Sequence, residues 1–309
     1  MLVSVIVITY NSSEYIEECL GSVLCQTYQE IQLIVTDDCS SDNTVPIVKK
    51  WLERHHGRFV SSRLVESSVN TGVASNCNRG LKESSGEWLK FIAGDDMLVA
   101  PGCISDFVES IPKKENVGVL FSYEYKLKDG EMILNKCPYE NIFFNKVMTA
   151  ERQFRVLIKK NFLPAPAAFV KAHVLKRIGG YDESIPMCED AVLWINMTQN
   201  GYALELIKKP LVIYRMHGGS LVDVFHRGVN IRIISDQIKI LERIKIPNHH
   251  FLFKLHFKSL RLLLKMAIRM DKHCHTIANI ILFIYRFNFN FINNIYFLML
   301  KLRVLCLRQ

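Results

Sequence analysis

Three pairs of adjacent carboxylates are the residues of this sequence best suited to chemistry: Asp37-Asp38, Asp95-Asp96 and Glu189-Asp190. The first two pairs follow short apolar runs, and the third opens a segment with helical spacing. Neighbouring carboxylates can hold a divalent cation that bridges to phosphate oxygens, and a carboxylate can also accept a proton as a general base. Taken singly, the pairs also suit a polar turn, a helix cap or a helix N-terminus. Their meaning depends on whether the fold brings them together.

Strand and helix signals alternate around these pairs. Apolar, β-branched runs predict buried strands at about 3–9 and 31–36, and two further strands are expected at about 59–65 and 87–93. Helical spacing predicts helices between them, one ending near Gln26, one opened by the polar turn 37–44 and one over 72–83. This α/β pattern predicts a mostly parallel sheet with flanking helices and right-handed crossovers. Asn11, with Glu14 three positions later, also resembles a helix N-cap and its partner.

Ligands of such sheets bind beyond the carboxyl ends of the strands. Three loops would place side-chain oxygens there: Thr9-Tyr10-Asn11, Asp37-Asp38 and Asp95-Asp96. No GxGxxG motif follows the first strand, so a dinucleotide site with a glycine-cradled pyrophosphate is not expected. A site that collects carboxylates has to bind an anion in another way, and a divalent cation between carboxylate and phosphate would do so.

Composition sets the class of protein. The chain has 309 residues, 49% of them hydrophobic and 22% charged, enough for a sizeable core. Nine cysteines without a CxxC pair fit reduced thiols better than a disulfide framework or a zinc site. The apolar start has no basic segment before it and no small-residue cleavage site after it, so it does not resemble a secretory signal. We therefore expect a cytoplasmic protein.

The positive charge is concentrated in the last quarter. Residues 227–309 contain 15 Lys and Arg against three acidic residues, whereas residues 1–226 contain 24 basic and 27 acidic residues. Six cations recur at helical spacing, with apolar Leu252, Leu263, Met266 and Met270 opposite them: Lys254, Lys258, Arg261, Lys265, Arg269 and Lys272. The apolar segment 277–300 is interrupted by Asn and Arg, so a spanning helix is not expected.

A basic amphipathic helix followed by an interrupted apolar segment is typical of a peripheral contact with an anionic membrane. We therefore place the protein at the inner face of the cell membrane. The alternatives are a helical cap on the catalytic core or the interface of a homodimer. Nucleic acid is not an expected partner, because no recognised binding module accompanies the charge.

Several longer stretches resemble family 2 glycosyltransferases, which have the GT-A fold. The donor half carries SVIVITYNSSEYIEECLGSVLCQTYQEIQLIVTDDCSSDNT, NTGVASNCNRGL and GEWLKFIAGDDML, and the acceptor half carries IGGYDES, CEDAVLWINMTQNGY and PLVIYRMHGGSL. The resemblance covers about residues 2–221, in the family's order. It implies a GT-A catalytic domain over 1–225, with a nucleotide-sugar-binding half (1–98) and an acceptor half (99–225). Residues 226–309 would form a C-terminal helical extension.

The resemblance assigns roles to residues of the donor half. Asp96 would ligate Mn²⁺ or Mg²⁺, and Asp95 would contact the ribose or the metal's water. Asp38, preceded by Asp37, would bind the uracil or ribose. Lining or contacting the nucleotide would be Thr9, Tyr10, whose ring would stack on the base, Asn11 and, as a weaker candidate, Asn78. The family often has an arginine where this sequence has Cys77, so an arginine–phosphate contact is not carried over.

In the acceptor half, the resemblance makes Asp190 the general base and Glu189 its support. Arg215 and His217 would belong to a segment that folds over the diphosphate, with His217 as a further metal or phosphate contact. The implied activity is inverting transfer of a sugar from a nucleotide-sugar donor, most simply UDP-linked, to a hydroxyl of a lipid-linked saccharide in bacterial O-antigen or capsule synthesis. The rival interpretations are a non-catalytic membrane scaffold with this fold and a nucleotidyltransferase.

Overall fold

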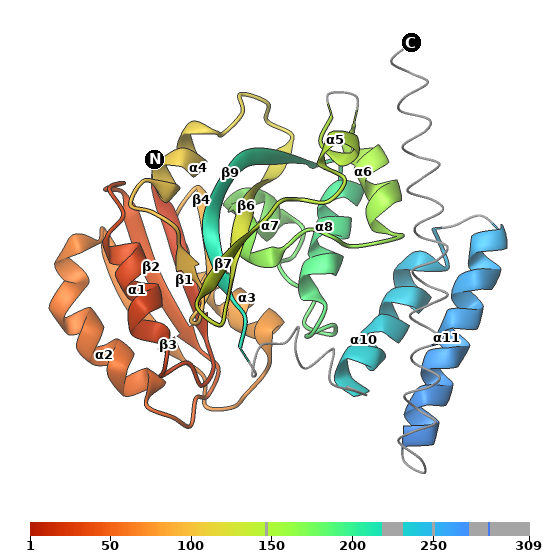
Figure 1. Ribbon diagram of the computed structural model, residues 1–309, viewed down its shortest axis with the longest axis horizontal. Helices are drawn as coiled ribbons and strands as arrows, with labels where there is room; N and C mark the ends of the chain where they lie inside the picture. The colour runs from red at the N-terminus through yellow and green to blue at the C-terminus, as the bar shows by residue number, and fades with distance from the viewer. Residues whose placement is uncertain (146–147, 218–230, 249–250, 272–283, 285–309) are drawn as a thin grey trace. The chain divides into compact units, whose positions relative to one another are not determined.

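The computed structural model describes the chain except residues 146–147, 218–230, 249–250, 272–283 and 285–309 (Figure 1). The chain divides into two compact units. The first contains residues 1–138, 149–153 and 162–216, and the second contains 139–148, 154–161 and 217–309. The second unit thus includes three short segments of the catalytic domain predicted over 1–225, namely 139–148, 154–161 and 217–225.

Four parallel strands form the first half of the sheet, as predicted. They are β1 (Val3–Thr9), β2 (Ile31–Asp37), β3 (Ser61–Glu66) and β4 (Trp88–Ala93), in the order β3-β2-β1-β4. All of β2 and nearly all of β1 and β4 are buried, which explains their continuous apolar runs.

Helices cover both faces of this half-sheet (Figure 1). Helix α1 (Ile16–Leu24) and helix α2 (Thr44–His55), which is followed by the 3₁₀ turn η1 (His56–Arg58), share a hydrophobic core with the alternate, buried residues Val3, Val5 and Val7 of β1. Helix α3 (Val73–Glu83) lies on the other face. The expected N-cap at Asn11 is wrong, because α1 begins at Ile16 and the Asn11 side chain instead accepts a hydrogen bond from the Ser41 backbone (2.9 Å).

The second half of the sheet mixes strand directions. Beyond β4 the order is β8 (Ala168–Lys171), β6 (Val117–Lys128), β9 (Ala203–Arg215) and β5 (Met97–Leu98). β8 runs antiparallel to both β4 and β6, and β7 (Glu131–Asn135) forms a hairpin with β6. The connecting helices are α4 (Cys103–Glu109), α5 (Glu140–Phe143), α6 (Ala150–Leu157), η2 (Ala165–Ala167), α7 (Ala172–Arg177) and α8 (Glu189–Gln199).

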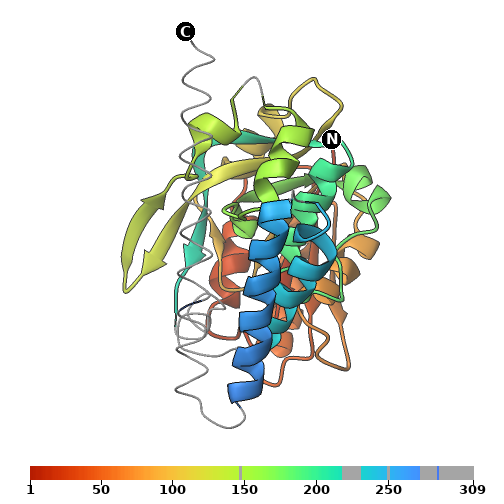
Figure 2. The same cartoon turned by 90° about the vertical axis from the view of Figure 1, so that its right-hand side faces the viewer.

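The second unit contains a pair of helices that lie side by side (Figure 2). Helix α10 (Ile231–Ile240) continues into a π-helical turn, η3 (Leu241–Lys245), and packs against α11 (Phe251–Asp271). Among the residues that the structure describes, no helix is both long and apolar enough to cross a membrane. The apolar segment 277–300 lies almost entirely outside those residues.

Helix α11 buries a different face from the one expected. Its core residues are Phe257, Leu260, Leu264 and Ala267, and Leu263 packs beside them. Met266, which we expected on the apolar face, is 43% exposed. Two cations of the predicted stripe, Arg261 and Lys265, pair with Glu242 of the neighbouring turn. Lys272 and the side chains of Leu252, Arg269 and Met270 are outside the described part of the chain.

Candidate active site

The carboxyl ends of β1, β2 and β4 meet at one edge of the sheet. In the strand register Thr9 pairs with Asp37, and Ile8 pairs with Ala93. The Asp38 backbone N–H donates to the Thr9 carbonyl (3.0 Å), and that of Gly94 donates to the Ile8 carbonyl (2.9 Å). The three predicted loops are therefore neighbours in space.

Asp96 is a fully buried carboxylate with one open oxygen. Its Oδ1 accepts a hydrogen bond from the Arg215 backbone N–H (3.0 Å), while Oδ2 has no hydrogen-bond partner within the described residues. Burial, and then the nearby charge of Asp95, raise the pKa of Asp96 well above its usual value. A Cβ at Gly94 would lie 2.9 Å from the Thr9 side chain, so glycine lets this turn approach β1 closely. A buried carboxylate of this kind suits a cation better than solvent.

Arg215 lies directly beside this turn. Its Nε donates to the Asp95 backbone carbonyl (3.0 Å), its other end pairs with Glu18, and its guanidinium lies over the Tyr15 ring, 4.6 Å from the centroid. Arg215 is expected from the sequence at the diphosphate, and in the structure it lies next to the Asp95-Asp96 turn. His217, two residues later, is half-buried and belongs to the second unit.

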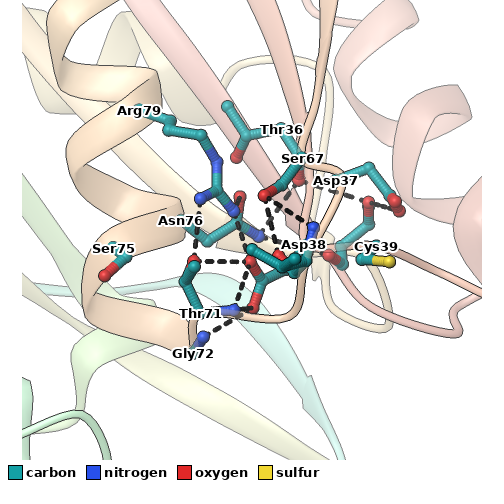
Figure 3. Close-up of polar contacts among 12 residues, drawn as sticks. Thr36, Asp37, Asp38, Cys39, Ser67, Thr71, Gly72, Ser75, Asn76 and Arg79 are labelled. Atoms are coloured by element: carbon teal, nitrogen blue, oxygen red, sulfur yellow. Dashed lines mark hydrogen bonds and ion pairs between the residues drawn. The ribbon is translucent and has the colours of Figure 1, made fainter.

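Asp38 is held by four donors from the segment after β3 and from α3 (Figure 3). Its carboxylate accepts hydrogen bonds from the Thr71 N–H and hydroxyl, from the Gly72 N–H (2.6 Å) and from the Arg79 guanidinium. Burial alone would raise the pKa of Asp38, but these hydrogen bonds outweigh it and hold the pKa below its usual value. Asp38 is thus ionised and fixes the shape of the loop that borders the strand ends.

Replacing Arg79 by Met should lower stability by about 1.5–3 kcal/mol at pH 7, because a buried carboxylate loses a charged donor. The folded-state pKa of Asp38 lies below its unfolded value, so this stabilisation is present above about pH 4 and is lost as pH falls through the folded pKa. Urea unfolding of Arg79→Met and wild type should therefore converge in acid. Arg63→Met, which breaks an exposed pair with Glu83, is the matched control and should cost at most about 1 kcal/mol. Equal losses would contradict this account.

Of the other candidate residues for nucleotide binding, two are buried and hydrogen-bonded within the protein and two are exposed. Thr9 and Asp37 are buried and hydrogen-bonded to each other (2.8 Å), and Asp37 also holds the Ser40 N–H and hydroxyl. Asp37 therefore shapes the turn after β2. Tyr10 is 51% exposed, as a ring that stacks on a base would have to be. Asn11 adopts a positive φ of 51° and is exposed.

Asn78 contacts the segment that leads to the base candidate. Its Nδ2 donates to the Tyr181 carbonyl (3.0 Å) and to Glu183 (2.7 Å), and its Oδ1 accepts from the Tyr181 N–H (2.9 Å). A Cβ at Gly180, where φ is +80°, would lie 2.6 Å from that Oδ1. These contacts join α3 to the 180–183 loop.

Glu189 and Asp190 form the first turn of α8 and are both half-buried. Asp190 Oδ1 accepts a hydrogen bond from the next backbone N–H, of Ala191 (2.6 Å). The two carboxylates lie close enough to Tyr181 to raise its pKa, although burial of that phenol is the larger cause. The base candidate is therefore partly accessible and positioned by a rigid helix end.

The described residues contain no group of three or more His, Cys, Asp and Glu side chains that could hold a metal by themselves. Asp95 and Asp96 nevertheless fit a cation that takes its remaining ligands from a bound diphosphate and water, the usual arrangement for Mg²⁺ with phosphates. The open, buried Oδ2 of Asp96 is the observation that fits.

Several polar residues near this edge were not predicted from the sequence. Asn76 bridges the ends of β1 and β2 by donating to the Thr9 and Thr36 carbonyls (3.2 and 3.1 Å). Arg79, Lys90 and Glu124 are the charged residues that were overlooked. Two signals were present: Arg79 directly precedes Gly80 in the NTGVASNCNRGL segment, and Lys90 interrupts the otherwise apolar strand WLKFIA.

Two known proteins are similar in sequence to this chain over most of their length. A glycosyltransferase of Haemophilus influenzae with no characterised activity is 24% identical over 303 residues, 92% of this chain and 90% of that protein. The Escherichia coli UDP-Glc:alpha-D-GlcNAc-diphosphoundecaprenol beta-1,3-glucosyltransferase WfaP is 25% identical over 268 residues, 85% of this chain and 95% of that protein.

Two solved structures share the fold. S. aureus TarS 1–349 in complex with UDP-GlcNAc has a TM-score of 0.61 and 22% identity, covering 89% of this chain and 74% of that one. The mannosyltransferase PcManGT from Pyrobaculum calidifontis, in complex with GDP-Man and Mn²⁺, has a TM-score of 0.61 and 19% identity, covering 84% and 69%. The predicted GT-A fold is confirmed by these neighbours.

The profile of Glycosyl transferase family 2 matches residues 4–179, more than half of the chain. That range contains all three donor-side loops and α3. With the strand-end carboxylates and the relatives named above, it shows that the protein is a glycosyltransferase and that the chain belongs to glycosyltransferase family 2.

Proposed function

We propose that this glycosyltransferase moves a sugar, with inversion, from a UDP-linked donor to a hydroxyl of a lipid-linked saccharide in bacterial surface-polysaccharide synthesis. The E. coli relative that aligns over most of both chains uses UDP-Glc and a diphosphoundecaprenol-linked acceptor, as its name states. TarS, which shares the fold, binds UDP-GlcNAc. These similarities support the donor and acceptor classes.

The observation that carries the proposal is the buried Asp96 carboxylate, with one open oxygen, beside Asp95 and Arg215. A transferase that releases a nucleoside diphosphate has to stabilise the negative charge that develops on the leaving group. Asp95 and Asp96 would hold Mn²⁺ or Mg²⁺, which supplies that stabilisation when bound. Arg215 adds a fixed positive charge next to the same turn. Burial disfavours the charged form of Asp96, so a buried carboxylate at this position gives no advantage to a protein without catalytic activity.

The transfer step follows from general-base chemistry. The acceptor hydroxyl oxygen forms a bond to the anomeric carbon while the bond from that carbon to the diphosphate oxygen breaks. The leaving nucleoside diphosphate keeps the electron pair, and the hydroxyl proton goes to the Asp190 carboxylate. Attack from the face opposite the leaving group inverts the anomeric carbon. The half-buried Asp190, at the start of a packed helix, is suited to this role.

Incubation of the full chain with a panel of UDP-, GDP- and dTDP-sugars, with detection of released nucleotide, tests the donor class. We expect turnover with a UDP-sugar and stimulation by a polyprenyl-diphosphate-linked saccharide. Turnover with GDP- or dTDP-sugars alone would contradict the UDP assignment. Release of pyrophosphate in place of nucleoside diphosphate would favour a nucleotidyltransferase.

We also propose that α11 contributes to membrane binding. Leu262, 60% exposed, and Met266 share a face with the exposed Lys258, a combination that suits the surface of an anionic bilayer. The alternative is that a second copy of the chain binds this face and forms a homodimer. We place the protein at the inner face of the cell membrane on this basis.

Replacing these three residues together, as Lys258→Gln, Leu262→Ser and Met266→Ser, should weaken membrane binding at least about tenfold. The lost cation contributes up to about 1 kcal/mol and the lost apolar burial more than that. Sedimentation with vesicles of equal parts phosphatidylglycerol and phosphatidylcholine measures it. Lys50→Gln with Val60→Ser, exposed residues of the first unit, is the matched control and should bind as wild type. Wild-type binding by the α11 variant would contradict the proposal.

A further inference from the structure

Lys90 is a lysine in the middle of a central, buried strand. It is the third residue of β4, pairs with Val5 of β1 and is 0% exposed. Its Nζ lies 5.6 Å from the centroid of the Phe107 ring, within the apolar core. Burying an ammonium group costs several kcal/mol unless hydrogen bonds and opposite charges compensate. The contacts of Lys90 must therefore offset the cost of burying its ammonium group.

The ammonium group holds two backbone carbonyls of the acceptor half. Lys90 Nζ donates to the carbonyls of Pro166 and Ala168, the latter at 3.2 Å. Ser122, also buried, donates its hydroxyl to the intervening Ala167 carbonyl (3.5 Å). Three consecutive carbonyls at the junction of η2 and β8 are therefore anchored by side chains of β4 and β6. This junction cannot shift without breaking buried hydrogen bonds.

Two buried carboxylates compensate the charge. Burial lowers the pKa of Lys90 to about 8, and the negative charges of Asp96 and Glu124 oppose that shift. Glu124 Oε1 accepts a hydrogen bond from Asn135 (2.8 Å), and its other oxygen has no hydrogen-bond partner in the described part of the chain. Lys90 thus lies in the electric field of the candidate metal ligand Asp96, which follows the end of β4 by three residues.

The anchored junction leads directly to the helix of the base candidate. Ala168 pairs with Phe121 in the β6–β8 register, and the Phe121 ring packs edge-on against Trp194, with centroids 4.9 Å apart. Trp194 is buried in α8, about one helical turn after Asp190. A continuous set of packed groups therefore connects Lys90 on β4 to α8.

We propose that Lys90 is a positioning residue of the transfer reaction, which fixes residues 166–168, and through them α8 with Asp190, relative to the Asp95-Asp96 turn. The inference rests on the proposed function. Its consequence is that Lys90 sets the placement of the base against the leaving group without contacting substrate. Misplacement of a catalytic group by about 1 Å can cost on the order of 100-fold in rate.

Lys90→Met keeps the length of the side chain and removes the charge and the donors. We expect the variant to bind UDP with a stoichiometry near one and a Kd within about threefold of wild type by calorimetry. We expect kcat for transfer to fall about 10- to 100-fold, with the donor KM nearly unchanged. The unchanged stoichiometry separates this effect from a loss of folded protein.

Ser122→Ala is the second variant, because a missing hydroxyl leaves the core nearly intact. It should lower kcat about two- to fivefold, and its effect should be less than additive with Lys90→Met, since both act on one segment. Ser84→Ala removes a buried hydroxyl that donates to the Leu81 carbonyl, elsewhere in the unit, and should leave kcat unchanged.

Full kcat in Lys90→Met, or a parallel loss of UDP binding and kcat, would overturn the inference. If Lys90→Met does not fold, Ser122→Ala decides the inference. Full kcat in Ser122→Ala would overturn the inference, and a loss of kcat in Ser122→Ala with unchanged UDP binding would support it. A wild-type chain that turns over no nucleotide sugar would overturn the proposed function together with this inference. An active wild type with unaffected variants would overturn the inference alone.

Discussion

Asp190→Asn should lower the rate of sugar transfer by about 10²- to 10⁴-fold, the usual loss when a general base is removed. The amide keeps the size and polarity of the side chain but cannot take the acceptor proton. Asp190 is half-buried at the start of α8, and its Oδ1 accepts a hydrogen bond from the Ala191 backbone N–H (2.6 Å). The amide oxygen of Asn can accept the same hydrogen bond, so we expect the variant to fold. Transfer kinetics at saturating donor measure the loss.

The nearby Asp182→Asn is the matched control. Asp182 is half-buried in the preceding loop and accepts a hydrogen bond from the Ser184 hydroxyl (2.6 Å). It should retain transfer within a few-fold of wild type. Binding of UDP should be nearly the same in Asp190→Asn and wild type. Near wild-type transfer by Asp190→Asn would show that another group is the base.

Asp96→Asn should lower turnover by at least about 10³-fold, because the cation that it would hold is expected to supply several kcal/mol to the transition state. Excess chelator should abolish the activity of the wild-type enzyme, and Mn²⁺ or Mg²⁺ should restore it. Neither metal should rescue the variant. Calorimetric titration of Mn²⁺ in the presence of UDP should show binding to wild type and none to Asp96→Asn.

The same substitution should not lower stability. Asp96 is buried with one oxygen that has no hydrogen-bond partner among the described residues, and burial disfavours its charged form. The attraction between Asp96 and Lys90 is smaller than the cost of burying Asp96, which raises its pKa overall. Removing that charge should therefore leave Tm equal or higher, as expected where function and stability conflict. Asp236→Asn, at a buried aspartate of the second unit, is the control and should retain full metal dependence. Full wild-type activity in excess chelator would contradict the metal role.

The donor half was predictable from sequence because its signals are local. Buried parallel strands give continuous apolar runs, and those of β1, β2 and β4 matched the structure within one or two residues. Their parallel order then places Thr9, Asp37 and Gly94 at one edge. The family resemblance adds roles for these residues that their spacing alone does not determine.

Features that depend on contacts distant in sequence were not predictable. Asn11 has the residue type of an N-cap, but its Oδ1 accepts a hydrogen bond from the Ser41 N–H of another loop, and α1 begins only at Ile16. The ion pair of Asp38 with Arg79 spans 41 positions. The antiparallel insertion of β8 between β4 and β6 follows from pairings that no local pattern encodes. Met266 faces solvent because α10 meets the opposite side of α11.

The anomeric configuration of the product tests the central claim most directly. The full chain would be incubated with an α-linked UDP-hexose that it turns over, a divalent cation and a polyprenyl-diphosphate-linked saccharide, and the new linkage examined by NMR. Inverting transfer by this family 2 enzyme, with Asp190 as base, predicts a β-linked product. An α-linked product, or nucleotide release without any new glycosidic bond, would contradict it.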